Sequence, residues 1–253
     1  MTTEKRKLDV CLSPELIGNY DTENTIVVII DIIRASSTIC TAFHYGLDEL
    51  VAVEKIDEAL KYKKQGYITA GERNGDKLEG FDMGNSPVGF MNPDLQGKKL
   101  AITTTNGTRT IKLITDKLNN DVEAELVVGA FVNYQTLFRY LKSAKKNILL
   151  VCSGWKGDLC VEDTVFAGKL VEDLNCYNMF THTLDAANHA RLIYNLAKDD
   201  LFGFIMDQSM RFKNKISSLG DDIRYCLKEN VTSTLPTLEN GHFINNGDKS
   251  MNN

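Results

Sequence analysis

What this sequence lacks excludes several common classes of protein. No Cys-x-x-Cys pair occurs among its six scattered cysteines, so a zinc or thioredoxin-type site has no support. The pattern GxxxxGKS/T is absent, which excludes a P-loop nucleotide-binding enzyme, and no GxGxxG follows a predicted strand, which excludes a nicotinamide-binding Rossmann domain. The four histidines lack the spacing of metal ligands.

Patterns typical of membrane proteins and nucleic-acid-binding proteins are missing too. The N-terminus MTTEKRKLDV has no apolar leader, and the longest apolar run is too short to span a membrane. We therefore expect a cytoplasmic protein with reduced thiols and no membrane partner. The net charge of −5 comes without a basic stripe, so we also expect no nucleic-acid partner. Whether the chain forms a homo-oligomer stays open.

What the chain does contain is a regular alternation of apolar strands and helical patterns. The expected strands are Leu8–Leu12, Thr25–Ile30, Glu49–Val53, Tyr67–Ala70, Lys99–Thr103, Glu125–Gly129, Asn147–Val151 and Met179–Thr181. The expected helices are Ser37–Tyr45, Ile56–Lys64, Gly107–Lys117, Tyr134–Ala144, Val161–Leu174, Leu184–Ala197, Leu201–Asn214 and Asp221–Glu229. This βαβ alternation predicts an α/β fold, with a mostly parallel sheet and helices on both faces in three α/β/α layers.

Two segments depart from this alternation. Residues 71–97 hold six glycines and two prolines without a helix or strand period, so we expect a long ordered loop, a feature that is commonly functional inside a compact domain. Residues 238–253 are rich in Asn and Gly and are predicted to form a flexible C-terminal tail. We expect residues 1–237 to form a single α/β unit, and a division into two subdomains near residues 175–200 stays open.

The clearest functional pattern is IVVIIDIIRASSTI at residues 26–39. Its first five residues are β-branched, which favours a strand buried on both faces, and such a strand ends where α/β proteins bind their ligands. At that end Asp31 can bind Mg²⁺, orient water or attack phosphorus, and Arg34 can hold phosphate or sulfonate oxygens. A plain ion pair between the two explains the segment equally well.

Residues 71–87 add carboxylates and a further arginine. The segments GERNG and GFDMGNSP supply Glu72, Arg73, Asp82 and Asn85. Glycines allow close approach of the backbone to a ligand, and carboxylates are ligands that Mg²⁺ prefers. By composition alone, a solvated loop rich in turns is the better explanation.

Two further strands end in polar loops. TTTNGTR at residues 103–109 brings hydroxyls, backbone N–H groups and Arg109 to a strand-to-helix turn, which favours an anion cradle. CSGWKGD at residues 152–158 precedes Glu162 and Asp163, which are candidates for a metal site although acids at a helix start also favour the helix dipole.

Two familiar phosphatase mechanisms do not fit these loops. Phosphatases with an aspartyl nucleophile use DxD after the first strand, whereas Asp31 is followed by two isoleucines. A cysteine phosphatase needs an arginine six positions after its cysteine, and Asp158 occupies that place after Cys152. We therefore expect Cys152 to be a buried thiol at a strand end.

Taken together, these segments resemble the 2-phosphosulfolactate phosphatase family. The resemblance rests on VVIIDIIRASSTI, GERNG, GFDMGNSP, TTTNGTR and VED in that order, and it covers residues 8–236. It implies a Mg²⁺-dependent α/β phosphatase that hydrolyses (R)-2-phospho-3-sulfolactate to sulfolactate and phosphate, a step toward coenzyme M. The chain departs from the family at Cys160 and in the stretch SMRFKNKISSLG, which has no histidine.

The resulting hypothesis is metal-assisted hydrolysis of a small anionic phosphate ester. Its catalytic residues are Asp31, Arg34, Arg109 and Glu72. Its substrate-binding residues are Arg73, Asn85, Thr105, Asn106, Ser153, Gly154 and Lys156, with Arg73 or Lys156 on the sulfonate or carboxylate. Its metal ligands come from Asp31, Glu72, Asp82, Glu162 and Asp163. Whether Asp31 is a ligand or a nucleophile stays open, with a ligand favoured. The chief alternative is a non-catalytic protein that binds a sulfonated or phosphorylated small acid.

Overall fold

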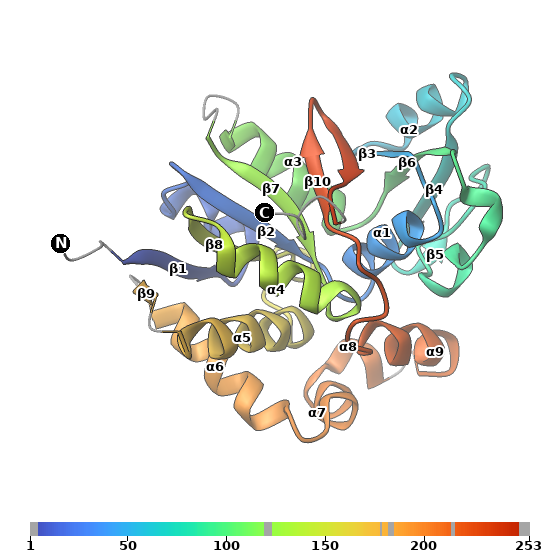
Figure 1. Cartoon of the computed structure of the whole chain (residues 1–253). Coiled ribbons are helices and arrows are strands. Elements are labelled where there is room, and N and C mark those ends of the chain that lie inside the picture. The colour runs from blue at the N-terminus through green and yellow to red at the C-terminus, as the bar shows by residue number, and fades with distance from the viewer. Residues whose placement is uncertain (1–4, 119–122, 178, 182–184, 214–215, 248–253) are drawn as a thin grey trace.

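The computed structural model describes residues 5–118, 123–177, 179–181, 185–213 and 216–247 (Figure 1). In this part of the chain the sheet has eleven strands in the order β5-β4-β6-β3-β11-β10-β7-β2-β8-β1-β9. The strands are β1 (Arg6–Cys11), β2 (Thr25–Ile30), β3 (Glu49–Ala52), β4 (Ile68–Arg73), β5 (Asp76–Lys77), β6 (Lys99–Thr103), β7 (Glu125–Gly129), β8 (Asn147–Cys152), β9 (Phe180–Thr181), β10 (Pro236–Glu239) and β11 (His242–Asn245). Each of the eight strands expected from the sequence is present, within a few residues at its ends.

Helices cover the sheet, and the result is the expected three-layer α/β fold. They are α1 (Ala35–His44), α2 (Ile56–Lys63), α3 (Gly107–Leu118), α4 (Tyr134–Ser143), α5 (Val161–Asn175), α6 (Asp185–Ala197), α7 (Leu201–Gln208), α8 (Met210–Lys213) and α9 (Ile216–Cys226). The expected single helix Leu201–Asn214 is wrong, because Ser209 has an extended backbone (φ −90°, ψ 106°) that separates α7 from α8. The expected start of α6 at Leu184 lies outside the described residues.

The sheet consists of two parallel blocks joined by one antiparallel hairpin. The smaller block is β4-β6-β3, with β5 antiparallel at its edge, and the larger block is β7-β2-β8-β1-β9. The hairpin β10–β11 lies between them and pairs Thr237 with Val127 and Phe243 with Leu50. The predicted flexible tail is therefore wrong for residues 238–245, because they hold the two blocks together; residues 248–253 lie outside the described part.

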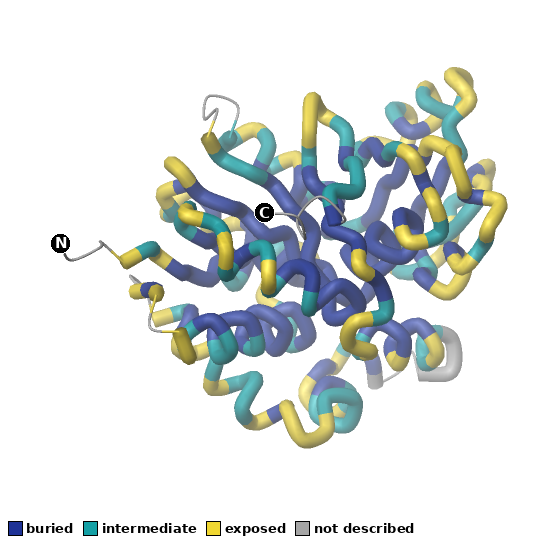
Figure 2. Tube along the Cα trace, viewed as in Figure 1, coloured by how far each residue is buried: buried dark blue, intermediate teal, exposed yellow. Residues whose placement is uncertain are grey.

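The core is centred on β2, whose six residues are all buried. Figure 2 shows buried segments along the strands and exposed segments at the loops and outer helix faces. Burial of each large aliphatic side chain of this kind contributes roughly 1.5–3 kcal/mol to stability. Since β2 pairs with β7 on one side and β8 on the other, its carboxyl end is fixed from both sides. The first polar residue beyond that end is Asp31.

Residues 71–97 begin with a hairpin rather than with an irregular loop. β4 continues to Arg73 and returns as β5 through Asn74 and Gly75, which have φ of 56° and 97°. Positive φ at both turn residues is what a two-residue hairpin of type I′ requires, and Asn-Gly is the sequence that favours it. The remainder is ordered mainly by the short 3₁₀ helices Val88–Phe90 and Pro93–Leu95. This hairpin brings Glu72, Asn74 and Gly75 close to α1.

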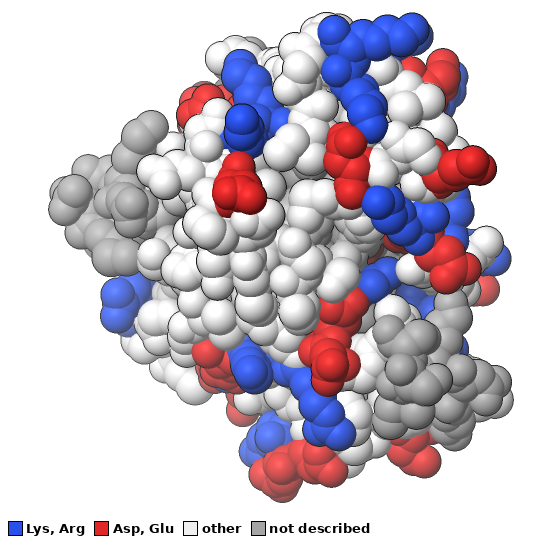
Figure 3. Space-filling model, turned by 90° about the vertical axis from the view of Figure 1, so that its right-hand side faces the viewer, with Lys and Arg blue, Asp and Glu red and all other residues white. Residues whose placement is uncertain are grey.

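The distribution of charge on the surface agrees with the mixed charges of the sequence. On the face shown in Figure 3, positive and negative side chains are interspersed, and no basic stripe crosses the described residues drawn there. No helix in the described part of the chain has the length and apolar character needed to cross a membrane. The subdomain division near residues 175–200 stays a prediction, although α5 and α6, before and within that interval, pack on each other.

Candidate active site

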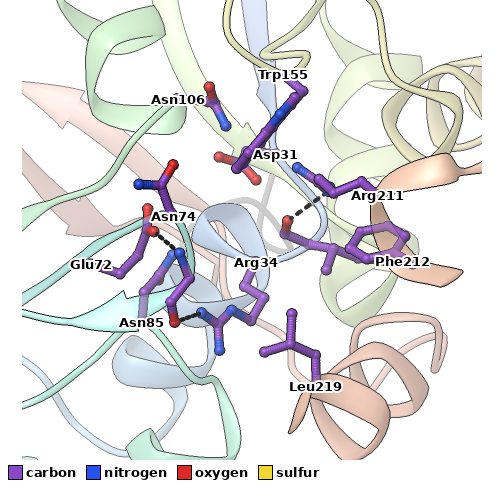
Figure 4. A pocket seen from close by; sticks show the side chains of 12 residues that line it. Asp31, Arg34, Glu72, Asn74, Asn85, Asn106, Trp155, Arg211, Phe212 and Leu219 are labelled. Carbon is purple, nitrogen blue, oxygen red and sulfur yellow. Dashed lines mark hydrogen bonds between the residues drawn. The ribbon is translucent and has the colours of Figure 1, made fainter. Parts of the chain in front are cut away.

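A pocket opens where the carboxyl ends of strands from both blocks meet (Figure 4). Asp31 follows β2, Glu72 lies at the end of β4, and Asn106 follows β6. The helices α8 and α9 close the other side. The lining residues drawn and labelled in Figure 4 are Asp31, Arg34, Glu72, Asn74, Asn85, Asn106, Trp155, Arg211, Phe212 and Leu219. This is the edge of a parallel sheet at which α/β proteins bind ligands.

Asp31 is a buried carboxyl group with excess negative charge around it. Its side chain is only 9% exposed, and burial together with the charges of Glu72 and Glu162 raises its pKa to about 6. Arg211 and the backbone N–H of Ala35 oppose this rise. A carboxyl group in this position binds a cation or a proton more readily than an exposed one does.

The lack of a side chain at Gly107 leaves space for the carboxylate of Asp31. A Cβ atom added to Gly107, the first residue of α3, would lie 2.8 Å from Oδ2 of Asp31 and 2.8 Å from Cβ of Ala35. Any side chain there would displace either the carboxylate or α1, since real Cβ atoms do not approach other atoms so closely. The small residue after the Thr-Thr-Thr-Asn run therefore lets α3 approach the carboxyl end of β2.

Glu72, in contrast, has donors on both oxygens. Its Oε1 accepts from the backbone N–H of Thr105 at 2.7 Å, and its Oε2 accepts from the N–H of Gly75 at 2.6 Å and from Oγ1 of Thr105 at 3.1 Å. Charge-assisted bonds of this kind are stronger than neutral ones. Glu72 therefore ties the β4–β5 hairpin to the loop after β6 while it faces the pocket.

The acids that open α5 have different roles. Oδ1 of Asp163 accepts from the N–H of Ile32 at 3.0 Å and Oδ2 accepts from the N–H of Gly154 at 3.1 Å, so Asp163 braces the loops after β2 and β8. Burial, with the charges of Asp31 and Glu162, raises the pKa of Asp163 well above its usual range. Oε1 of Glu162 pairs with Arg211, and its buried Oε2 has no partner among the described residues.

Arg34 is held in place by a buried network of three segments. Its Nη1 donates to Oδ2 of Asp222 on α9 at 2.7 Å, and its Nη2 donates to the carbonyl of Gly75 at 3.0 Å. The other oxygen of Asp222 accepts from Oγ of Ser86 at 2.6 Å. Because the Arg34 and Asp222 side chains are each only 9% exposed, this ion pair is shielded from water and fixes the guanidinium at the pocket wall.

Arg211 reaches the pocket from α8 in a very different setting. Its guanidinium carbon lies 4.5 Å from the ring centroid of Trp155 and 4.2 Å from that of Phe212. Its Nη2 pairs with Glu162 and lies 3.5 Å from the carbonyl oxygen of Ile33. Aromatic contacts and an ion pair therefore hold this second arginine beside Asp31, whose pKa its charge lowers.

The sequence of this chain is similar to those of known proteins of one family. A family model described as 2-phosphosulpholactate phosphatase matches residues 11–241. Proteins named probable 2-phosphosulfolactate phosphatase from Thermotoga petrophila and Thermotoga maritima are each 37% identical over 218 residues, which cover 86% of this chain and 90% of the relative. A protein of the same name from Clostridium tetani is 32% identical over 239 residues, 92% of this chain and 98% of the relative.

The chain belongs to the 2-phosphosulfolactate phosphatase family. The resemblance found in the sequence is thereby confirmed. The match to the family spans every residue that lines the pocket.

For a member of this family, the structure brings about a third of the predicted site residues directly to the pocket. Those that line it are Asp31, Arg34, Glu72, Asn85 and Asn106. Thr105, Gly154, Glu162 and Asp163 lie behind them and hydrogen-bond or pair with lining residues or the loops that carry them. Ser153 is buried next to this group, and its Oγ has no partner among the described residues.

The other four predicted residues do not line the pocket either. Arg73 donates to the carbonyls of Glu72 and Glu54 and to Thr103, and Arg109 pairs with Glu15. The other two are Asp82, which pairs with Lys63 and accepts from Thr69, and Lys156, whose backbone N–H donates to Asn106. Their predicted roles in catalysis, metal binding or substrate binding stay predictions, and none enters the function proposed below.

Sequence reasoning missed several residues of the pocket and its support. They are Asn74, Trp155, Arg211, Phe212, Leu219 and Asp222. The Asn-Gly turn was a readable signal for Asn74. The residues from α8 and α9 follow no motif. The expectation for Cys152 agrees with the structure, since burial and the charge of Asp163 raise the pKa of this thiol well above its usual range.

The carboxylates of this family member suit a metal ion that takes only one or two of its ligands from the protein. No three Asp, Glu, His or Cys side chains in the described part of the chain come close enough to form an all-protein metal site. Mg²⁺, however, commonly binds one or two carboxylates and takes its other ligands from water and phosphate. Asp31, whose charge is only partly compensated, and Oε2 of Glu162, which has no partner among the described residues, fit such a site.

Proposed function

We propose that this protein is a Mg²⁺-dependent phosphomonoester hydrolase that converts 2-phospho-3-sulfolactate to 3-sulfolactate and phosphate. The family supports the reaction class, and the names of the relatives support the substrate. The pocket supports both, because its two arginines suit an ester with more than one negative group. In this proposal the enzyme works in the cytoplasm, in a step of the kind that leads to coenzyme M.

Asp31, which lines the pocket, would hold the metal ion, and Oε2 of Glu162 is a further acceptor near Asp31. Bound there, Mg²⁺ would withdraw charge from the phosphoryl oxygens and lower the pKa of a bound water. Of the predicted metal ligands, Glu72 and Asp163 are less suited, because each oxygen of both carboxylates already accepts a backbone N–H.

Arg34 would bind the phosphoryl group. Two of its nitrogens are held by Asp222 and Gly75, so its remaining donors are presented to the pocket with little loss of side-chain entropy. The amides of Asn74 and Asn106 line the same side and would donate to phosphoryl oxygens. Charge that develops on these oxygens in the transition state is then stabilised by donors already in place.

The observation that carries this proposal is the buried, only partly compensated Asp31 at the end of β2, in a pocket that Arg34 and Arg211 also line. The test is release of inorganic phosphate from 2-phospho-3-sulfolactate with Mg²⁺, with EDTA as control. We expect release with Mg²⁺ and almost none with EDTA. Full activity in EDTA would contradict the metal dependence, and binding without release would favour the non-catalytic alternative.

A further inference from the structure

The two arginines of the pocket lie in chemically different surroundings. Arg34 lies among polar groups, namely the carbonyl of Gly75, the carboxylate of Asp222 and the amide of Asn85. Arg211 lies on a wall formed by the rings of Trp155 and Phe212. Figure 4 shows that the two side chains enter from different elements. A substrate with two unlike anionic groups can use this difference.

The rings of Trp155 and Phe212 restrict how Arg211 can bind a ligand. Rings near the guanidinium carbon leave the edges of the guanidinium as its hydrogen-bonding surface. Only Nη2 has hydrogen-bond partners among the described residues, which are Glu162 and the carbonyl of Ile33. Nη1 and Nε have no partner among the described residues, so each can donate a hydrogen bond to an oxyanion in the pocket.

The apolar wall also selects the kind of anion. Taking a charged group out of water costs free energy, and the cost is smaller for a group whose charge is spread over several oxygens and weakly hydrated. A sulfonate monoanion has this character, whereas a phosphate dianion bound to Mg²⁺ needs the polar side of the pocket. The guanidinium is itself weakly hydrated, so its pairing with a sulfonate loses little solvation.

We propose that Arg211, which packs against the rings of Trp155 and Phe212, binds the sulfonate of the substrate and makes the enzyme specific for sulfonated phosphate esters. This inference rests on the proposed function. It gives Arg211 the role that the sequence had suggested for Arg73 or Lys156, neither of which lines the pocket. Arg211 is thus a substrate-binding residue, while Arg34 binds the phosphoryl group at the other side.

Trp155 is a positioning residue in this arrangement. It lies in a tight turn in which Trp155 and Asp158 exchange backbone hydrogen bonds of 2.8 and 3.1 Å. Two neighbours fix the turn: Oδ1 of Asn106 accepts from the N–H of Lys156 at 3.0 Å, and Oγ of Ser13 donates to the carbonyl of Gly157 at 2.6 Å. A fixed ring keeps the guanidinium of Arg211 from swinging into solvent.

The first experiment compares two substrates that differ only in the sulfonate. These are 2-phospho-3-sulfolactate and 2-phospholactate, which has hydrogen in place of the sulfonate. For Arg211→Gln we expect kcat/KM for the sulfonated ester to fall about 100-fold, while that for 2-phospholactate changes less than about threefold. Arg139→Gln is the matched control, because Arg139 is exposed on α4 and should leave both values unchanged.

A conservative variant protects this experiment against misfolding. Arg211→Gln leaves the buried Glu162 without its partner, which can destabilise the fold. Arg211→Lys keeps the positive charge but cannot pair with Glu162 and donate to a ligand from separate nitrogens of one planar group. We expect it to fold like the parent and to lose about tenfold in kcat/KM on the sulfonated ester only.

The second experiment measures binding without catalysis. Trp155 is the only tryptophan of the chain, so its fluorescence reports on this wall alone. Titration with the product 3-sulfolactate should change the emission of the parent, and lactate at the same concentration should not. Arg211→Gln should abolish the response to sulfolactate. This readout stays valid even if the protein releases no phosphate from any ester, and in that case the proposed function fails while the sulfonate site stands.

Two results would overturn the inference. One is an equal loss of kcat/KM on both esters in Arg211→Lys, which would place Arg211 on the phosphoryl group or on Asp31. The other is an unchanged preference for the sulfonated ester in Arg211→Gln, together with an unchanged fluorescence response.

Discussion

The carboxyl ends of β2 and β4 each present one buried carboxylate to the same pocket, and their surroundings are opposite. Asp31 after β2 is 9% exposed and Glu72 at the end of β4 is 6% exposed, so burial does not distinguish them. Glu72 receives three hydrogen bonds from the loops beside it. The pKa of Asp31 is raised to about 6 by burial and by the nearby charges of Glu72 and Glu162, and Arg211 offsets only part of this rise.

This difference gives the two carboxylates different roles: Glu72 stabilises the structure of the site, and Asp31 is available to bind a ligand. Glu72 has its charge satisfied by the protein, so it stabilises the β4–β5 hairpin whether or not a ligand is bound. Asp31 is destabilising in the empty protein at neutral pH, which is tolerable only if a cation or substrate compensates it. Such conflicts between stability and function are typical of active sites.

The largest effect should follow from replacing Asp31. We expect Asp31→Asn to lower kcat with Mg²⁺ by about 10³-fold, since it removes the charge that holds the metal and leaves the remaining site intact. Phosphate release under saturating substrate measures this. Retention of full Mg²⁺-dependent activity would show that the carboxylate of Asp31 is neither a ligand nor a nucleophile.

The same comparison predicts opposite changes in stability without metal. The pKa of Asp31 is raised from 3.8 to about 6 in the folded protein. Between these values the folded protein keeps a proton that the unfolded chain has released, so the free energy of unfolding falls as pH rises through this window. The loss amounts to about 3 kcal/mol at pH 7, and Asp31→Asn should recover most of it.

Urea denaturation in EDTA at pH 4.5 and pH 7 tests the direction of these changes in the free energy of unfolding. Asp31→Asn should be more stable than the parent at pH 7, with a smaller difference at pH 4.5. The burial of Asp163 acts in the same direction, so some slope should remain in the variant. Glu72→Gln should instead lose about 1–3 kcal/mol, because its amide nitrogen cannot accept the N–H groups that the carboxylate accepts. Equal signs for the two variants would refute the distinction between the two strand ends.

Much of the fold could be read from the sequence because its signals are local. Runs such as Thr25–Ile30 predict buried strands, and all eight expected strands are present. Both unpredicted hairpins turn on an Asn-Gly pair with positive φ: Asn74–Gly75, and Asn240–Gly241 with φ of 51° and 84°. The Asn-Gly pairs predict such turns, but the Asn- and Gly-rich composition of both segments was interpreted as a loop and a flexible tail. The place of the second hairpin, between the two parallel blocks, depends on long-range pairing that no local pattern encodes.

The residues of the site likewise include some that local patterns predict and some that only tertiary packing places there. Asp31 and Glu72 follow strand-like segments and could be predicted from the rule for strand ends. Arg211 and Asp222 lie on helices after residue 200 and reach the pocket only through tertiary packing against Glu162 and Arg34. Composition favoured Arg73 and Arg109 because they stand next to the motifs, but the structure turns their side chains to carbonyls and to Glu15.

A smaller effect is expected at Asp222, which positions Arg34 on the β4 side of the pocket. Asp222→Asn keeps an oxygen for hydrogen bonding but removes the charge opposite the guanidinium. We expect KM to rise about tenfold with kcat changed less than about threefold, for the sulfonated and unsulfonated esters alike. Asp221→Asn is the control, since Asp221 is the exposed neighbour on α9. Identical kinetics of the two variants would mean that Arg34 needs no such support.

The smallest effect should be at Asp82, which the sequence placed among the metal ligands. Asp82 lies beside Thr69, near the amino end of β4, whereas Glu72 lies at the carboxyl end of the same strand, roughly 10 Å further along. Burial alone would raise its pKa, but hydrogen bonds from Lys63 and Thr69 lower the pKa to about 2, so its charge is already compensated. Asp82→Asn should therefore change Mg²⁺-dependent activity less than about twofold and cost at most about 1 kcal/mol of stability, as is usual for a half-exposed pair. Loss of activity with an unchanged thermal melting curve, restored by high Mg²⁺, would instead place a metal ligand at the amino end of β4.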